Sequence, residues 1–113
     1  MIRDINFFIE DILTSINAIK EYTQDIDRSG LEKSRLKQSA IIREIEIIGE
    51  AVKNIPEQVK VKHEEIEWRK IAGMRDVIIH GYFMVDLDAV WNVIEKDLPI
   101  LKKQIEKIKL KGI

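Results

Sequence analysis

The chain has 113 residues, 45% of them hydrophobic and 35% charged, which suits one globular domain and excludes both a disordered and a membrane-spanning protein. Its 19 Lys and Arg residues and 20 Asp and Glu residues give a net charge of −1, so nucleic acid could be bound only through a local basic patch. The absence of cysteine excludes disulfides and cysteine-based zinc sites, and five glycines and two prolines are too few for a turn-rich β-fold. We therefore expect one α-helical domain over residues 1–113.

The N-terminal sequence predicts neither a targeting signal nor a membrane anchor. Met1-Ile2-Arg3-Asp4 reaches an acidic residue too early for a signal peptide, and no apolar run approaches the length of a transmembrane helix. A chain without cysteine also suits a reducing compartment. We expect a cytoplasmic protein.

Hydrophobic residues recur every three or four positions over residues 4–25, which predicts an amphipathic helix of about 20 residues. This stripe comprises Ile5, Phe8, Ile9, Ile12, Ile16 and Ile19. A polar segment with turn chemistry follows over residues 25–30.

A second helix is predicted over residues 31–55, with Pro56 as its stop. Its hydrophobic stripe comprises Leu36, Ala40, Ile41, Ile45, Ile48 and Val52. Ile42 and Ile47 lie off this stripe, and the surplus apolar surface indicates self-association.

Residues 57–63 predict only a short helical turn or loop, and residues 64–80 a third long helix. Gly81 follows that helix as the preferred residue just past a C-terminus. Asp86 is expected to cap a fourth helix, and Pro99 to kink it. The hydrophobic positions of these two helices are Ile66, Ile71, Met74, Ile78, Ile79, Val90, Val93, Ile94, Leu98, Leu101, Ile105 and Ile108. We expect an all-α antiparallel bundle of four to five helices.

Of the two histidines, His80 is the candidate for chemistry. His63 stands in a run of charged residues, where we expect a solvated side chain. Asp76 precedes His80 by four residues, which would place a carboxylate opposite the imidazole across one helical turn. Such a partner fixes which ring nitrogen carries the proton and favours the protonated form. A helix C-terminus also favours the protonated form.

Arg75, Asp76, His80 and Tyr82 would form a polar patch at this helix end, and a symmetric dimer would bring two such patches around one cleft. That combination suits phosphodiester cleavage without a metal ion. Histidine can move protons to and from a ribose 2′-hydroxyl and the leaving 5′-oxygen, while arginine holds the phosphate and stabilises the transition state. From spacing alone, a hydrogen-bonded helix cap is the simpler explanation of the cluster.

The segment Arg75-Asp76-Val77-Ile78-Ile79-His80-Gly81-Tyr82 resembles the R-x4-H-x-Y signature of HepT-type toxins in the HEPN superfamily of ribonucleases. A polar residue directly after the arginine is usual in that family, and Asp76 agrees. The surroundings are similar as well, namely residues 48–51 (Ile-Gly-Glu-Ala), 68–74 and 83–86. The resemblance covers nearly the whole chain in order and spacing.

This resemblance implies a homodimeric HEPN-type bundle that cleaves RNA, with transfer RNA as the family-level target, and that needs no metal or other cofactor. Arg75 and His80 would be the catalytic pair, and Asp76 would support His80. It also implies a toxin–antitoxin system of the type II or VII kind. The partner would be a minimal nucleotidyltransferase antitoxin that attaches AMP to the motif tyrosine, so Tyr82 would become an O-AMP-tyrosine.

Other conspicuous residues have simpler explanations. Small residues predict close helix packing rather than a phosphate-binding loop at Gly49, Ala51, Ala72 and Gly73. Glu50 is expected to be an exposed or capping carboxylate. Core or interface positions are expected for Trp68, Phe83 and Trp91. A run of lysines near the C-terminus is the candidate for a local RNA path and comprises Lys102, Lys103, Lys107, Lys109 and Lys111.

Two alternatives to a ribonuclease stay open at this point. One is a non-catalytic helical docking subunit for a nucleotidyltransferase, and the other is a plain dimerisation domain. An intact Arg, polar and His motif favours the ribonuclease, because docking alone needs none of these side chains. Incubation with total RNA in EDTA, beside a His80→Ala control, separates the three.

Overall fold

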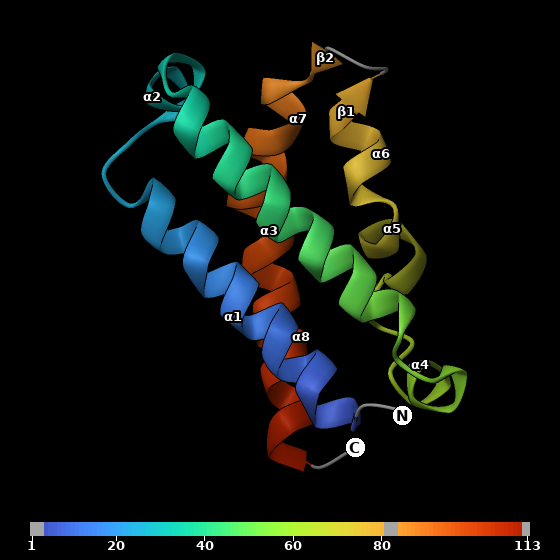
Figure 1. Cartoon of the computed structure of the whole chain (residues 1–113). Coiled ribbons are helices and arrows are strands. Elements are labelled where there is room, and N and C mark those ends of the chain that lie inside the picture. The colour runs from blue at the N-terminus through green and yellow to red at the C-terminus, as the bar shows by residue number, and fades with distance from the viewer. Residues whose placement is uncertain (1–3, 81–83, 112–113) are drawn as a thin grey trace.

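A computed structural model describes residues 4–80 and 84–111, which form an antiparallel bundle of long helical segments (Figure 1). The predicted all-α bundle is therefore confirmed. The segments are, in order, α1 (Ile5–Thr23), α3 (Arg35–Lys53), α5 (Trp68–Ala72) with α6 (Met74–Ile78), and α7 (Leu87–Asn92) with η1 (Val93–Asp97) and α8 (Leu98–Lys111). Two short helices, α2 (Arg28–Lys33) and α4 (Glu57–Lys62), connect the first three segments.

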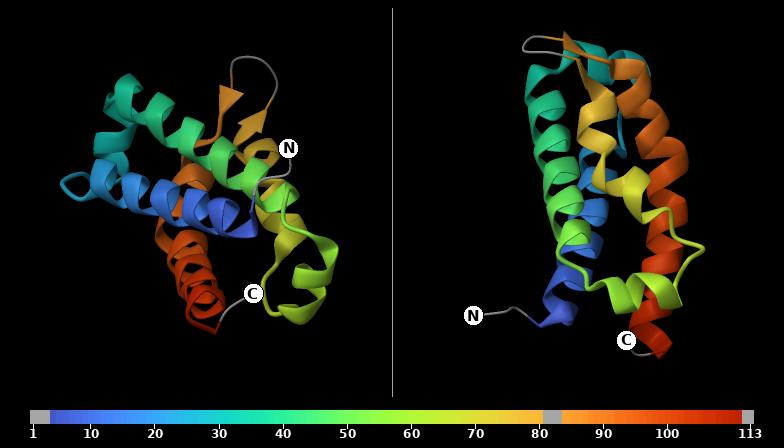
Figure 2. Two further views of the ribbon diagram at one scale, coloured as in Figure 1. Left: turned by 60° about the horizontal axis from the view of Figure 1, so that its bottom comes forward. Right: turned by 90° about the vertical axis from the view of Figure 1, so that its right-hand side faces the viewer.

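The core lies between these segments and is almost entirely aliphatic. On α1 the predicted stripe is confirmed, with Ile9, Ile12, Ile16 and Ile19 buried. Figure 2 shows α1 and α3 side by side, with α8 packed against α1. No helix within residues 4–80 or 84–111 is both long and apolar enough to cross a lipid bilayer.

The second long helix begins later than predicted, because Ser34 has extended backbone angles (φ −116°, ψ 96°) that separate α2 from α3. The Ser34 side chain accepts a hydrogen bond from the backbone N–H of Lys37 (3.1 Å) and so caps α3. Asp27 caps α2 in the same way, which makes part of the predicted turn helical. Leu36, predicted to be in the core, lies in the first turn of α3 and is 80% exposed.

The third segment differs most from the prediction of one helix over residues 64–80. It begins only at Trp68, breaks at Gly73, and ends at Ile78. There the chain enters a two-stranded antiparallel ladder of β1 (Ile79–His80) and β2 (Met84–Val85), which pairs Ile79 with Val85 and His80 with Met84. The backbone N–H of Asp86 donates to the carbonyl of Ile78 (2.7 Å), so a hydrogen bond across this ladder ends the helix before His80. Gly81, the predicted cap, lies outside the described residues.

The fourth segment confirms the predicted cap and shows how the chain accommodates Pro99. Asp86 accepts a hydrogen bond from the backbone N–H of Ala89 (3.0 Å). Pro99 has no N–H to offer the carbonyl four residues earlier, which is the bond that α-helical winding requires. Residues 93–97, which end two positions before Pro99, wind as a π-helix, and the N–H of Leu98 donates to the carbonyl of Val93.

Candidate functional site

The site predicted from the sequence lies where α6 passes into β1. Arg75 and Asp76 are the second and third residues of the five-residue helix α6, and His80 is the second residue of β1. Met74 and Ile78 are 3% and 0% exposed, so they fix one face of α6 against the core and leave Arg75 on the outside. Tyr82, the predicted modification site, and Phe83 lie outside the described residues.

The prediction that Asp76 faces His80 across one helical turn assumed a continuous helix, but the helix ends at Ile78. Ile79 has extended backbone angles (φ −112°, ψ 113°), so His80 does not follow Asp76 by one helical turn. The Asp76 side chain is 87% exposed, and Oδ1 lies 4.0 Å from Nη1 of Arg75.

Arg75 forms an ion pair that the sequence did not predict. Its Nε lies 3.3 Å from Oε2 of Glu46 on α3, and the two side chains are 52% and 48% exposed. The pair joins residues that are far apart in the sequence, so no local spacing indicates it. The one indication in the sequence is that Glu46 stands two residues before the Ile-Gly-Glu-Ala segment (48–51).

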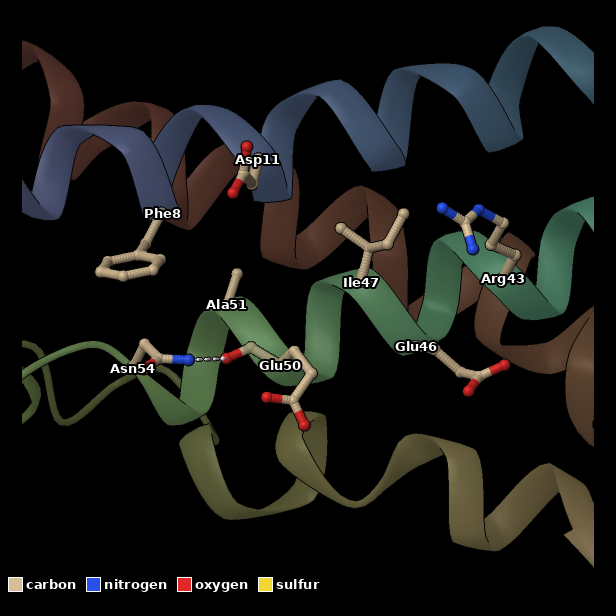
Figure 3. Close-up of a pocket in the computed structure, with 8 residues that line it drawn as sticks. All are labelled: Phe8, Asp11, Arg43, Glu46, Ile47, Glu50, Ala51 and Asn54. Atoms are coloured by element: carbon tan, nitrogen blue, oxygen red, sulfur yellow. Dashed lines mark hydrogen bonds between the residues drawn. The ribbon is translucent and has the colours of Figure 1, made fainter. Parts of the chain in front are cut away.

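A shallow groove of about 290 Å³ runs along the outer face of α3 beside α1 (Figure 3). It is lined by Phe8, Asp11, Arg43, Glu46, Ile47, Glu50, Ala51 and Asn54. Figure 3 shows Ile47 and Ala51 directed toward α1, whereas Glu46 and Glu50 point to the other side, where α5 and α6 lie. Glu46 lines this groove and also pairs with Arg75, which lies on the α6 side of α3 and does not itself line the groove.

The predicted close packing at Gly49 is confirmed. Gly49 is buried, and a β-carbon added to it would lie 3.3 Å from the carbonyl oxygen of Ala72. The backbones of α3 and α5 therefore approach closely one turn after Glu46 and three residues before Arg75. Glu50 is exposed, as predicted, and its carboxylate lies 4.0 Å from Nζ of Lys53.

Two further predictions concern residues remote from this site. His63 is less solvated than predicted, since only 19% of its side chain is exposed. Its Nδ1 lies 3.7 Å from Oε1 of Glu65, and Nε1 of Trp68 donates a hydrogen bond to its backbone carbonyl. The lysines near the C-terminus lie on α8, which runs toward the end of the bundle opposite β1 (Figure 1). Lys109 is paired there with Glu10.

Across the described part of the chain, no three His, Asp or Glu side chains gather closely enough to hold a metal ion. The site contains the guanidinium of Arg75, the carboxylates of Glu46 and Asp76, and His80, whose backbone belongs to β1. A guanidinium with free N–H groups can bind a phosphate through two parallel hydrogen bonds.

Comparison with known proteins shows which family the chain belongs to. Residues 12–108 match the family of HepT-like ribonucleases. A Thermococcus cleftensis protein named "Probable ribonuclease HepT" is 43% identical over 109 residues, which are 96% of this chain and 99% of that protein. A Methanocaldococcus jannaschii protein named "Gamma-glutamylcyclotransferase and putative RNase" is 45% identical over 108 residues, but the chain spans only 49% of its length. No solved structure is significantly similar. The chain therefore belongs to the HepT-like ribonuclease family.

Proposed function

We propose that this protein is an endoribonuclease in which Arg75 and His80 carry out the cleavage of RNA without a metal ion. The observation that carries the proposal is the exposed guanidinium of Arg75 on α6, five residues before His80, in a chain of the HepT-like ribonuclease family. In this proposal Asp76 supports His80 from α6, although not across a helical turn. The substrate is cytoplasmic RNA, with transfer RNA as the first candidate.

The reaction requires only groups that the chain and its substrate supply. A ribose 2′-oxygen attacks the adjacent phosphorus while its proton passes to one histidine, and the bond from phosphorus to the 5′-oxygen breaks. A second histidine gives a proton to that leaving oxygen, so the products are a 2′,3′-cyclic phosphate and a 5′-hydroxyl end. Arg75 binds the phosphate and stabilises the charge that develops on it.

Because each chain contributes one His80, the proposal places the reaction in the cleft of a homodimer. Val77 on α6 is 57% exposed and Met84, opposite His80 in the ladder, is 67% exposed. A second copy that covered these apolar side chains would also bring its own Arg75 and His80 nearby. Light scattering after size-exclusion chromatography tests this, and a monomer at the concentrations that cleave RNA would contradict it.

Cleavage is expected to persist in EDTA. Proton transfer by histidine and charge stabilisation by arginine involve no metal ligand, so chelation removes nothing that the proposed reaction uses. Total RNA incubated with the purified protein, with and without EDTA, gives the measurement on a denaturing gel. Activity that disappears in EDTA and returns with Mg²⁺ or Mn²⁺ would contradict a metal-independent reaction.

We further propose that the protein is the toxin of a toxin–antitoxin pair, controlled by a minimal nucleotidyltransferase. The partner would transfer AMP from ATP to the Tyr82 oxygen with release of pyrophosphate. The motif places Tyr82 two residues after His80, so the added phosphate would carry negative charge to the site that binds RNA. It would pair with Arg75 and repel the substrate.

The Tyr82→Phe variant is expected to escape this modification, because phenylalanine lacks the acceptor oxygen. After incubation with the partner and ATP, the intact mass of the wild type should rise by ~329 Da for each AMP, whereas that of Tyr82→Phe should not change. The variant keeps its aromatic ring and is expected to remain folded. A gain of the same mass by Tyr82→Phe would place the modification on another residue.

A further inference from the structure

We infer that Glu46 is a positioning residue for Arg75, holding its guanidinium in the orientation that receives the RNA phosphate. This inference rests on the proposed ribonuclease function and adds a residue to it. Glu46 Oε2 lies 3.3 Å from Nε of Arg75, and the two residues come from different long segments of the bundle, α3 and the α5–α6 segment.

Both ends of the ion pair are attached to anchored backbone. On α3, the neighbours Ile45 and Ile48 are fully buried and hold Glu46 on the outer face of the helix. On α6, Met74 and Ile78 do the same for Arg75. The contact therefore restrains a long side chain that would otherwise sample many rotamers at the surface, and this restraint exists before RNA arrives.

Whether Glu46 positions Arg75 for RNA or blocks it depends on which guanidinium nitrogen the carboxylate contacts. An arginine has five N–H donors, and the contact with Glu46 is made through Nε. The edge formed by Nη1 and Nη2 remains for two parallel hydrogen bonds to phosphate. Asp76 is the other carboxylate near this guanidinium, but it is 87% exposed and 4.0 Å away, so it restrains Arg75 less.

Glu50 provides a matched control for Glu46. It stands one helical turn further along α3, is also exposed, and points to the same side of the helix (Figure 3). Its carboxylate lies 4.0 Å from Nζ of Lys53, whereas the ion pairs of Arg75 within the described part of the chain are with Glu46 and Asp76. Replacement of either glutamate by alanine removes one negative charge from the same face, so a difference between the variants reports the contact with Arg75.

The test measures kcat and KM on a fluorophore-labelled single-stranded RNA of mixed sequence. For Glu46→Ala we expect kcat to fall about ten- to hundredfold, as for a misplaced catalytic group. KM should stay the same or decrease, because a charge that repels RNA has been removed. Glu46→Gln keeps an acceptor for Nε and should restore part of kcat, whereas Glu50→Ala should keep wild-type kcat.

Three outcomes would overturn the inference. Equal kinetics for Glu46→Ala and Glu50→Ala would show that the contact has no role, and a higher kcat for Glu46→Ala would show that Glu46 holds Arg75 away from RNA. Loss of kcat together with a large drop in melting temperature, also in Glu46→Gln, would indicate a purely structural role, because exposed ion pairs contribute little to stability.

A second measurement does not depend on cleavage and so separates this inference from the proposed function. The chain has six arginines, and an Arg75→Lys variant identifies the Nε signal of Arg75 in a nitrogen-15 NMR spectrum. Relaxation of that signal should report a more mobile guanidinium in Glu46→Ala than in wild type or Glu50→Ala. If the wild type does not cleave RNA, the proposed function fails; if Arg75 is equally mobile in all three proteins, the positioning role fails.

Discussion

Replacement of Arg75 or His80 by alanine is expected to reduce the rate of RNA cleavage by about 10²–10⁴-fold. Removal of a single group that stabilises transition-state charge costs about 10²–10³ in rate, and loss of general acid–base catalysis about 10²–10⁴. Both variants should keep the fold. Arg75 is 52% exposed, so its truncation is expected to cost about 1 kcal/mol or less of the free energy of unfolding.

The Arg75→Lys variant should also be inactive, because an ammonium group lacks the planar fork that binds two phosphate oxygens and has no Nε to meet Glu46. Arg69→Ala is the control, since Arg69 is an exposed arginine on α5. Activity is measured on total RNA, and the fold by circular dichroism. If Arg75→Ala or His80→Ala is unfolded, the replaced residue has a structural role. If a variant cleaves RNA at the wild-type rate, the replaced residue is not catalytic.

Truncation of Ile45 to alanine is expected to have the largest effect on stability. Ile45 is fully buried at the centre of α3, which packs against α1 on one side and against α5 and α6 on the other. Loss of a buried isoleucine side chain typically costs about 2–5 kcal/mol, because apolar burial is lost and a cavity remains. Total stabilities of small domains are roughly 5–15 kcal/mol, so the melting temperature should fall by on the order of 10–20 °C.

Leu36→Ala on the same helix is the matched control. The hydrophobic pattern placed Leu36 with Ile45 in one stripe, but its exposure of 80% predicts a change within about 0.5 kcal/mol. Denaturant titrations of both variants give the two changes in the free energy of unfolding, provided that the dependence on denaturant concentration has the same slope in each. A loss in Leu36→Ala as large as that in Ile45→Ala would mean that Leu36 is covered in solution.

Hydrophobic periodicity was sufficient to predict the bundle, because each long segment buries one stripe. It failed at the breaks within segments. Ile71, Met74 and Ile78 are all buried although Gly73 interrupts the helix between them, so the spacing of core residues does not reveal the interruption. At the other break, Ser34 ends α2 and caps α3, and Leu36, which the hydrophobic pattern placed in the core, is exposed in the first turn that follows.

The motif carrying Arg75 and His80 was visible in the sequence, but the surroundings of the arginine were not. The relation of Asp76 to His80 was inferred from an assumed helical turn, and hydrogen bonds across a short ladder replaced that turn. Glu46 meets Arg75 only because α3 and α6 lie side by side. Such a contact depends on how two segments pack, and one sequence does not specify that distance.

At Gly49, a substitution that raises stability is expected to disturb the alignment of Glu46 with Arg75. Glycine within a helix ordinarily lowers the free energy of unfolding by roughly 0.5–1 kcal/mol relative to alanine, so replacing it is a common way to raise thermal stability. Here the new methyl group would meet the Ala72 carbonyl at 3.3 Å, and α5 would have to yield by a fraction of an ångström. Arg75 follows Ala72 by three residues and Glu46 precedes Gly49 by three, so that displacement would be transmitted to the ion pair. A more heat-resistant variant obtained at Gly49 would therefore be a slower ribonuclease.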